Sequence, residues 1–214
     1  MKPTRLLISA IALAACSLSA FAQNLISNGT FDAYTGPAIT PGSNNFQTVN
    51  AGVGSITGWT VGGTSVDVIN NGAYGAISGN SIDMLGTPGP GSLSQSFSST
   101  SGQQYLLNFD LSCNVCAAPQ LGVSINGGAQ TLFTGTLTAA SQHQTMNFTA
   151  VAGATTLLTF YGIPAKGDFY SGAVLDNVSV TAVPEPETFA ILLSGLGLMG
   201  SIGRRRSLKA AASA

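Results

Sequence analysis

Asp176 is the residue of this 214-residue sequence whose position most strongly suggests chemistry. If residues 174–180 form a strand, Asp176 shares one face with the valines at 174, 178 and 180. If that is the core face, a carboxylate points inward, and a buried charge is costly without a partner. Only one lysine and no arginine lie between residues 23 and 182, so a bound cation is the expected partner. The alternative is that Asp176 faces solvent or caps a turn.

Aromatic side chains in or beside loops are the candidates for ligand contact. These are Tyr34, Tyr74, Tyr161, Phe169 and Tyr170. We predict that Tyr34, Phe169 and Tyr170 form the rim of a binding site, since an aromatic face suits the C–H groups of a sugar ring. Trp59 is the single tryptophan. It could be a stacking platform, but its strand-like surroundings favour a place in the core.

Few residues support catalysis. His143 is the lone histidine and lies in a polar segment, and there is no Gly-x-Ser-x-Gly nucleophile motif. Two acids about 5 to 9.5 Å apart would suit glycoside hydrolysis. Asp67, Asp83 and Asp110 could come close in a β fold, but the sequence singles out no pair. We therefore expect a protein that is not an enzyme, with polysaccharide hydrolysis as the least favoured alternative.

The central part of the sequence predicts β-strands. Apolar and polar residues alternate with a period of two in short segments that glycine, asparagine and proline interrupt. The predicted strands are 24–27, 56–61, 66–69, 81–85, 92–98, 105–112, 121–125, 130–135, 144–150, 155–163 and 173–181. Asn126-Gly127-Gly128 is typical of a hairpin turn. About ten short strands with frequent turns predict an all-β fold, a jelly-roll β-sandwich over residues 23–182.

The N-terminus carries an export signal. A short basic stretch, an apolar segment and Ala20-Phe21-Ala22 predict a signal peptide, residues 1–22, that is cleaved before Gln23. Leu13-Ala14-Ala15-Cys16 leaves the alternative of a lipoprotein with Cys16 as its lipidated N-terminus.

Residues 183–214 form a tail of three parts. Pro184, Glu185 and Pro186 make an extended spacer, because proline fixes φ and lacks an N–H group. An uncharged apolar segment follows at 188–203, and Arg204, Arg205 and Arg206 end it. This order predicts a single hydrophobic helix that enters the membrane with its basic end in the cytoplasm. At about 1.5 Å per residue it reaches only about 24 Å of the roughly 30 Å hydrocarbon core. Such a marginal span favours a temporary stop that a processing enzyme cuts.

Cys113 and Cys116 form a Cys-x-x-Cys pair. In the cytosol this spacing would suggest redox work or half of a zinc site, but the sequence has no second pair. Exported proteins meet oxidising conditions, so we expect a disulfide between Cys113 and Cys116. A disulfide to another matrix protein is the minor alternative.

The order and spacing of the tail resemble the PEP-CTERM sorting signal of Gram-negative bacteria, from residue 183 to Arg206. The resemblance implies export and transient insertion in the inner membrane. It also implies cleavage near Pro-Glu-Pro by exosortase, a membrane transpeptidase, and delivery to the cell surface or the extracellular polysaccharide matrix.

Residues 24–182 resemble the choice-of-anchor C group of exported proteins. The order of several motifs carries the resemblance: residues 24–32 (NLISNGTFD), 56–59 (ITGW), 65–69 (SVDVI), 93–97 (LSQSF) and 175–180 (LDNVSV). These proteins are similar to galactose-binding-like jelly rolls, as in carbohydrate-binding modules. The resemblance implies one structural Ca²⁺ held by Asp32 and Asp176, with backbone carbonyls completing its oxygen ligands. The family often has glutamate at the second position, and Asp176 is one methylene shorter.

The charge of the domain limits its partners. Between residues 23 and 182 one lysine stands against six aspartates, a net charge of −5 with histidine neutral. A domain so poor in basic residues has no electrostatic footprint for nucleic acid. We therefore expect an exported surface or matrix protein whose partners are a polysaccharide or matrix proteins. A purely structural or adhesive protein without a saccharide site is the alternative.

Overall fold

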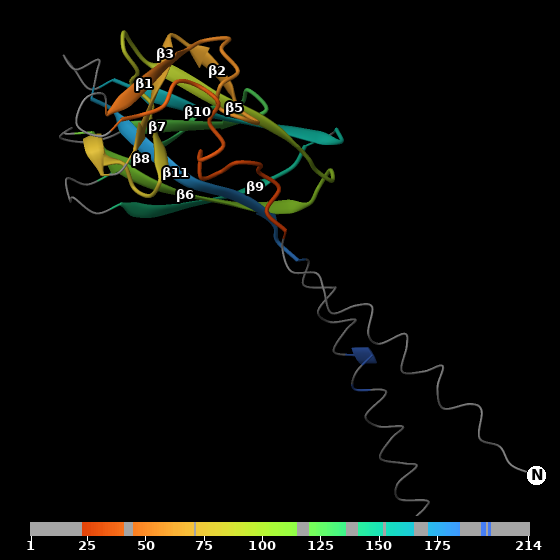
Figure 1. The fold of residues 1–214 in the computed structure, drawn as a ribbon. Coiled ribbons are helices and arrows are strands. Elements are labelled where there is room, and N and C mark those ends of the chain that lie inside the picture. The colour runs from red at the N-terminus through yellow and green to blue at the C-terminus, as the bar shows by residue number, and fades with distance from the viewer. Residues whose placement is uncertain are drawn as a thin grey trace, which may run out of the picture. The chain divides into compact units, whose positions relative to one another are not determined.

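The computed structural model describes residues 23–40, 45–70, 72–114, 120–135, 141–151, 153–164, 171–184, 194, 195 and 197. Over these residues the chain forms eleven strands and one short 3-10 helix, η1 (Ala73–Gly75) (Figure 1). The strands are β1 (Phe46–Asn50), β2 (Thr60–Gly63), β3 (Ser65–Asn70), β4 (Asn80–Asp83), β5 (Gly91–Ser98), β6 (Gln104–Cys113), β7 (Gln120–Ile125), β8 (Thr131–Thr134), β9 (Gln142–Thr149), β10 (Thr155–Ile163) and β11 (Ala173–Ala182). The all-β prediction is confirmed.

The strands form two antiparallel sheets that pack face to face as a jelly-roll β-sandwich. The six-stranded sheet has the order β1-β3-β4-β11-β6-β9, and the five-stranded sheet has the order β2-β5-β10-β7-β8. Figure 1 shows β6, β11 and β9 in one layer and β5, β10 and β7 in the other. Neighbouring strands can be far apart in the sequence: β4 pairs with β11, which puts Asp83 opposite Val174. The register of these strands decides which side chains meet.

The inner faces of both sheets build the core. In β6 the inward residues are Tyr105, Leu107, Phe109 and Leu111. Trp59 is only 4% exposed and its ring lies 5.4 Å from that of Phe31, so its predicted place in the core is confirmed. Its indole N–H donates to the carbonyl of Asn28 at 3.0 Å. The tryptophan therefore ties the first turn of the domain to the core instead of presenting a surface to a ligand.

The predicted strands overlap the observed ones except at the N-terminus. Residues 24–27 form no strand, because the Asn24 side chain accepts hydrogen bonds that a strand would make through its backbone. Oδ1 of Asn24 accepts the N–H groups of Ile26 and Val180, both at 3.0 Å. The segment still lies against β11, since the N–H of Leu25 donates to the carbonyl of Val180. The sequence does not predict β1, because Val49 is its only buried residue and no alternation is visible.

A β-bulge in β11 decides where Asp176 points. The register with β6 shifts between Asp176 and Ser179, and Asn177 has a φ of 53°. The extra residue reverses the alternation. The residues of β11 that belong to the core cluster are Ala173, Leu175, Val178 and Val180. The interpretation that Asp176 shares a face with Val178 and Val180 is therefore wrong. Asp176 lies on the outer face of the six-stranded sheet.

Residues 1–182 and 183–214 form two separate compact units. No helix among the described residues is long and apolar enough to cross a membrane. The predicted hydrophobic helix at 188–203 lies outside the described residues except for three positions, and the predicted signal peptide lies wholly outside them.

Candidate functional site

A pocket of about 400 Å³ lies on the outer face of the six-stranded sheet. Strands β3 and β4 form its floor. Alternating residues of these strands belong to the core, namely Val66, Val68 and Ile82, so Asp67 and Asp83 point the other way. The pocket is lined by Phe46, Asp67, Ile69, Tyr74, Asp83, Thr87, Asn114 and Ser171. Its volume falls within the range of roughly 300–1,000 Å³ that is usual for small-molecule sites.

Asp67 and Asp83 form the polar floor of this pocket. They are directly opposite each other across the antiparallel β3–β4 pair, a register in which Cβ atoms lie about 5 Å apart. Asp67 is 5% exposed and Asp83 is 1% exposed. Thr87 donates to Asp67 twice, from its N–H at 3.2 Å and its hydroxyl at 3.0 Å. Asp83 accepts hydrogen bonds from the N–H of Leu85 at 2.9 Å and from Nδ2 of Asn114 at 2.6 Å. Neutral donors thus hold both carboxylates in place.

Burial makes ionisation of Asp83 costly. It raises the pKa of Asp83 to about 7, although the hydrogen bond from Asn114 acts in the opposite direction. The charge of Asp67 adds to the rise. Near neutral pH the pair can therefore accept hydrogen bonds from hydroxyl or amino groups, and its protonated form can donate one.

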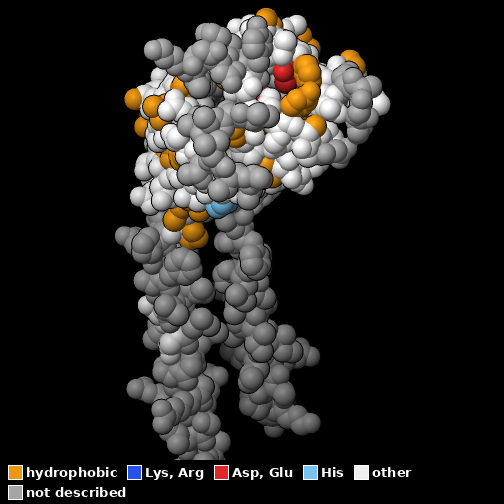
Figure 2. All heavy atoms as spheres, turned by 90° about the vertical axis from the view of Figure 1, so that its left-hand side faces the viewer, with side chains coloured by type: hydrophobic (Ala, Val, Ile, Leu, Met, Phe, Trp, Pro, Cys, Tyr) orange, Lys and Arg blue, Asp and Glu red, His pale blue; other side chains and the backbone are white. Residues whose placement is uncertain are grey.

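Two aromatic rings form the apolar part of the lining. Phe46 of β1 and Tyr74 of η1 meet edge to face, with ring centroids 5.8 Å apart and planes at 78°. Tyr74 is 39% exposed. Figure 2 shows an acidic side chain at the surface with hydrophobic side chains beside it, and no lysine or arginine on the described surface in view. Apolar edges beside a few fixed polar groups are typical of sites for small polar ligands.

Asp176 is the centre of a second polar cluster on the same face of the sheet. It is 0% exposed. Its Oδ2 accepts hydrogen bonds from the N–H of Ser78 and the hydroxyl of Ser81, both at 3.2 Å, and its Oδ1 accepts the N–H of Asn177 at 2.7 Å. Burial raises the pKa of Asp176 to about 6 against the effect of these hydrogen bonds, and the charge of Asp32 adds to the rise.

Asp32 reaches the same loop, since its Oδ1 accepts the N–H of Asn80 at 3.0 Å. The structure thus brings Asp32 and Asp176 together at residues 78–81. The described residues contain no lysine or arginine that could pair with these carboxylates. A buried carboxylate with a second carboxylate nearby fits a cation such as Ca²⁺. The described residues contain no group of three or more acidic, histidine or cysteine ligands. Backbone carbonyls and water would have to supply the other oxygens.

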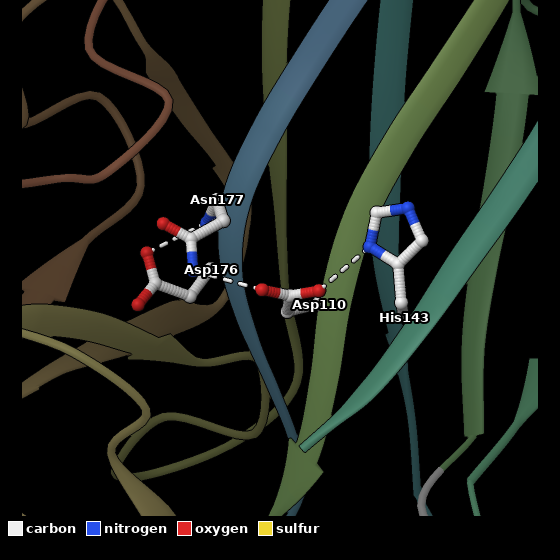
Figure 3. A network of polar contacts seen from close by, with 4 residues as sticks. All are labelled: Asp110, His143, Asp176 and Asn177. Carbon is white, nitrogen blue, oxygen red and sulfur yellow. Dashed lines mark hydrogen bonds and ion pairs between the residues drawn. The ribbon is translucent and has the colours of Figure 1, made fainter.

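A chain of polar contacts leads from Asp176 to the surface of the domain (Figure 3). Asn177, which follows Asp176 in the bulge, donates from Nδ2 to Oδ2 of Asp110 at 2.8 Å. Oδ1 of Asp110 lies 2.9 Å from Nδ1 of His143. The residues come from β11, β6 and β9, three adjacent strands. The His143 side chain is 61% exposed, so this histidine is a surface partner of Asp110.

The predicted aromatic rim is only partly described. Tyr34 is half-buried, packs against the core and forms a β-bridge with Ile56. Burial raises the pKa of Tyr34. Tyr34 is not among the described residues that line the pocket. Phe169 and Tyr170 lie outside the described residues, which resume at Ser171 on the pocket wall. Tyr74, one of the loop aromatics that the sequence picks out, does line the pocket.

The predicted disulfide and sorting residues are also only partly described. Cys113, the last residue of β6, is disulfide-bonded, while Cys116 lies outside the described residues. Pro184 is exposed. The other sorting residues, Glu185, Pro186, Arg204, Arg205 and Arg206, lie outside the described part of the chain.

The pairing of Asp67 with Asp83 is the feature that sequence reasoning misses. A signal for it exists. The period-two pattern places both residues on the faces opposite to Val66, Val68 and Ile82, and strands that follow each other in the sequence often pair. The register that sets them side by side is not visible in either segment alone.

Comparison with known families identifies both parts of the chain. Residues 24–181 match the family described as "Protein of unknown function (DUF642)", and the chain belongs to this family. Residues 182–207 match the PEP-CTERM protein-sorting motif. The predicted sorting tail is thereby confirmed, and it marks an exported protein that is anchored transiently at the membrane. No curated protein matches the sequence.

Similar solved structures include carbohydrate-binding modules. The CBM22-1 xylan-binding domain of Paenibacillus barcinonensis Xyn10C is 15% identical with a TM-score of 0.44, over 65% of this chain and 94% of that one. TmCBM61 in complex with β-1,4-galactotriose is 13% identical with a TM-score of 0.42, over 76% and 100%. The exo-β-1,3-galactanase of Phanerochaete chrysosporium is 16% identical with a TM-score of 0.41, over 64% of this chain and 29% of the enzyme. This chain thus spans less than a third of that enzyme. Likeness at this level does not identify a ligand.

Proposed function

We propose that this protein is an exported, non-catalytic, glycan-binding protein of the cell surface or extracellular matrix, and that the glycan binds in the pocket over β3 and β4. The observation that carries the proposal is the lining of the pocket. The rings of Phe46 and Tyr74 stand beside the buried carboxylates of Asp67 and Asp83 and the amide of Asn114. Sugars offer C–H groups that pack on aromatic rings and hydroxyls that carboxylates and amides bind.

The tail supports the proposed route to the surface. Exosortase would cut the chain near Pro184, Glu185 and Pro186 and release the domain, while the arginines at 204–206 hold the tail at the cytoplasmic side. Matrix polysaccharide is then the glycan within reach. Matrix proteins are the other proposed partners.

We also propose that Asp32 and Asp176 hold one structural Ca²⁺. The ion would supply the positive charge that the described residues lack around Asp176. It would join the loop at residues 78–81 to the start of the domain. Its role would be to stabilise the fold, because Asp32 and Asp176 are not among the described residues that line the pocket.

Glycan binding is tested with the exported protein on an array of oligosaccharides, followed by calorimetry with the best ligand. Replacing Tyr74 or Phe46 by alanine should weaken binding about fivefold, since one aromatic contact is worth about 1 kcal/mol. His143→Ala, which lies outside the pocket, should bind like the wild type. Tyr170→Ala tests the predicted rim. If no glycan binds, the structural or adhesive role replaces the proposed one.

A second candidate function is glycoside hydrolysis. The observation that favours it is the Asp67–Asp83 pair, in which a carboxyl of raised pKa lies beside another carboxyl, as acid catalysis of this kind requires. Thr87 engages both oxygens of Asp67, which leaves that carboxylate poorly placed as a nucleophile or base. Release of reducing sugar that stops in Asp83→Asn, with the fold intact, would establish hydrolysis.

A further inference from the structure

The pairing of Asp67 with Asp83 is unfavourable for the stability of the six-stranded sheet. Like charges directly opposite each other on neighbouring strands destabilise a sheet, and burial increases their repulsion. A buried pair of this kind that no neighbour among the described residues compensates is expected at functional sites. A positive charge beside the floor of the pocket would reduce this repulsion.

The described residues do not supply a cation. They contain no lysine or arginine. The lone histidine, His143, lies on β9 and contacts Asp110. The hydrogen bonds to the pair come from Thr87, Leu85 and Asn114 and from the backbone of Gly172, and all of these donors are neutral. The single lysine of the domain sequence, Lys166, lies outside the described residues. A ligand of positive charge would therefore be attracted to Asp67 and to the ionised form of Asp83.

We propose that the pocket binds a cationic sugar, a glycan residue with a free amino group whose ammonium lies between Asp67 and Asp83 while its ring packs against Phe46 and Tyr74. This inference rests on the proposed glycan-binding function and names its substrate class. An ammonium has three N–H donors and no acceptor, which suits a floor of carboxylate oxygens. Aromatic rings also attract a cation held near their faces. The pocket, at about 400 Å³, has room for the ring as well as the charged group.

Two other ligand chemistries fit less well. A divalent metal ion prefers a cage of oxygen atoms, whereas N–H and O–H donors already face these carboxylates and aromatic rings fill part of the wall. A uronic acid would bring a third carboxylate to a pair that already repels itself. N-acetylation removes the positive charge of an amino sugar and adds bulk, so an acetylated residue should bind weakly.

The test compares matched oligosaccharides by calorimetry on the exported protein. The probes are a β-1,4-linked glucosamine tetramer, its fully N-acetylated counterpart, cellotetraose and tetragalacturonate. We expect the glucosamine tetramer to bind at least tenfold more tightly than the neutral tetramers, and the galacturonate not to bind. Asp67→Asn and Asp83→Asn keep the size of the side chain and should abolish the preference. Asp110→Asn, on the same face but outside the pocket lining, should retain it.

Each outcome separates this inference from the function on which it rests. If the neutral tetramers bind as well as the glucosamine tetramer, or if the preference survives in both pocket variants, the amino-sugar inference is wrong while glycan binding stands. If no saccharide binds, the proposed function itself fails. If CaCl₂ alone binds and Asp83→Asn removes that binding, the floor is a metal site and the inference is overturned. Thermal melting of each variant confirms that it is folded.

Discussion

Burial raises the pKa of Asp83, and this makes the stability of the domain depend on pH. The Asp83 carboxylate has an ordinary pKa of 3.8, and burial raises it to about 7. A raised pKa means that the folded protein prefers the protonated form more than the unfolded chain does. The contribution of Asp83 to stability is therefore fully present below about pH 4 and is lost as the pH rises through about 7. Asp176, with a pKa raised to about 6, acts in the same direction.

We therefore predict that the domain loses stability between pH 4 and pH 7.5, and that Asp83→Asn reduces this loss. At about 1.4 kcal/mol per pKa unit, the Asp83 contribution has an upper limit of about 4 kcal/mol. Urea unfolding across this pH range measures it, and the carboxyl ¹³C shift of Asp83 follows its titration. Asn114→Ala removes a hydrogen bond that lowers the pKa, so it should move this titration upwards. An unchanged pH dependence in Asp83→Asn would contradict the prediction.

Asp176 allows a second test at the scale of single residues. If Asp32 and Asp176 hold Ca²⁺, adding CaCl₂ raises the melting temperature and a chelator lowers it, because a ligand that binds only the folded state stabilises it. Asp176→Asn should remove the difference. Asp110 contacts Asp176 only indirectly, through Asn177, so Asp110→Asn should keep the calcium-dependent difference in melting temperature. A melting temperature that does not respond to calcium or chelator in the wild type would rule out the site.

Among the structural elements, the bulge of β11 has the clearest consequence. Asn177 has a φ of 53°, which asparagine tolerates and a β-branched residue does not. We predict that Asn177→Val destabilises the domain by about 2–4 kcal/mol, from backbone strain and the lost hydrogen bond to Asp110. Asn177→Gly keeps the backbone and should lose only about 1 kcal/mol. Equilibrium unfolding in urea measures both. Equal losses in the two variants would show that the bulge conformation carries no strain penalty.

The same bulge marks the limit of what the sequence predicts. Regular alternation finds the strands, and Asn126-Gly127 predicts the β7–β8 turn, where both residues have positive φ and the N–H of Gly128 donates to the carbonyl of Ile125. One extra residue in β11 reverses the face of Asp176, and nothing in the alternation reveals it. The pocket depends on long-range pairings and on loops that close over β3 and β4. Asp67, Asp83 and Tyr74 could be picked out in advance, but the sequence does not show which of the aspartates pair or that Tyr74 lies beside them.

For the molecule as a whole, charge divides the two sheets. The strands of the five-stranded sheet contain no charged residue. The six-stranded sheet carries four aspartates on the face away from the core, namely Asp67, Asp83, Asp110 and Asp176. Both the pocket and the proposed calcium site lie on this acidic face.

The sorting motif of the tail marks the domain for export with transient anchoring at the membrane. As a helix, the apolar residues 188–203 would reach about 24 Å, short of the roughly 30 Å hydrocarbon core, so we expect a temporary stop for the proposed processing and not a permanent anchor. We predict that the mature protein begins at Gln23 and lacks Arg204, Arg205 and Arg206, which mass spectrometry of the intact protein from its host can measure. Replacing the three arginines by alanine should leave unprocessed chain in the cells, because the basic cluster fixes the tail at the cytoplasmic side. Mature protein that stays in the inner membrane and still carries residues beyond Arg206 would contradict release by cleavage.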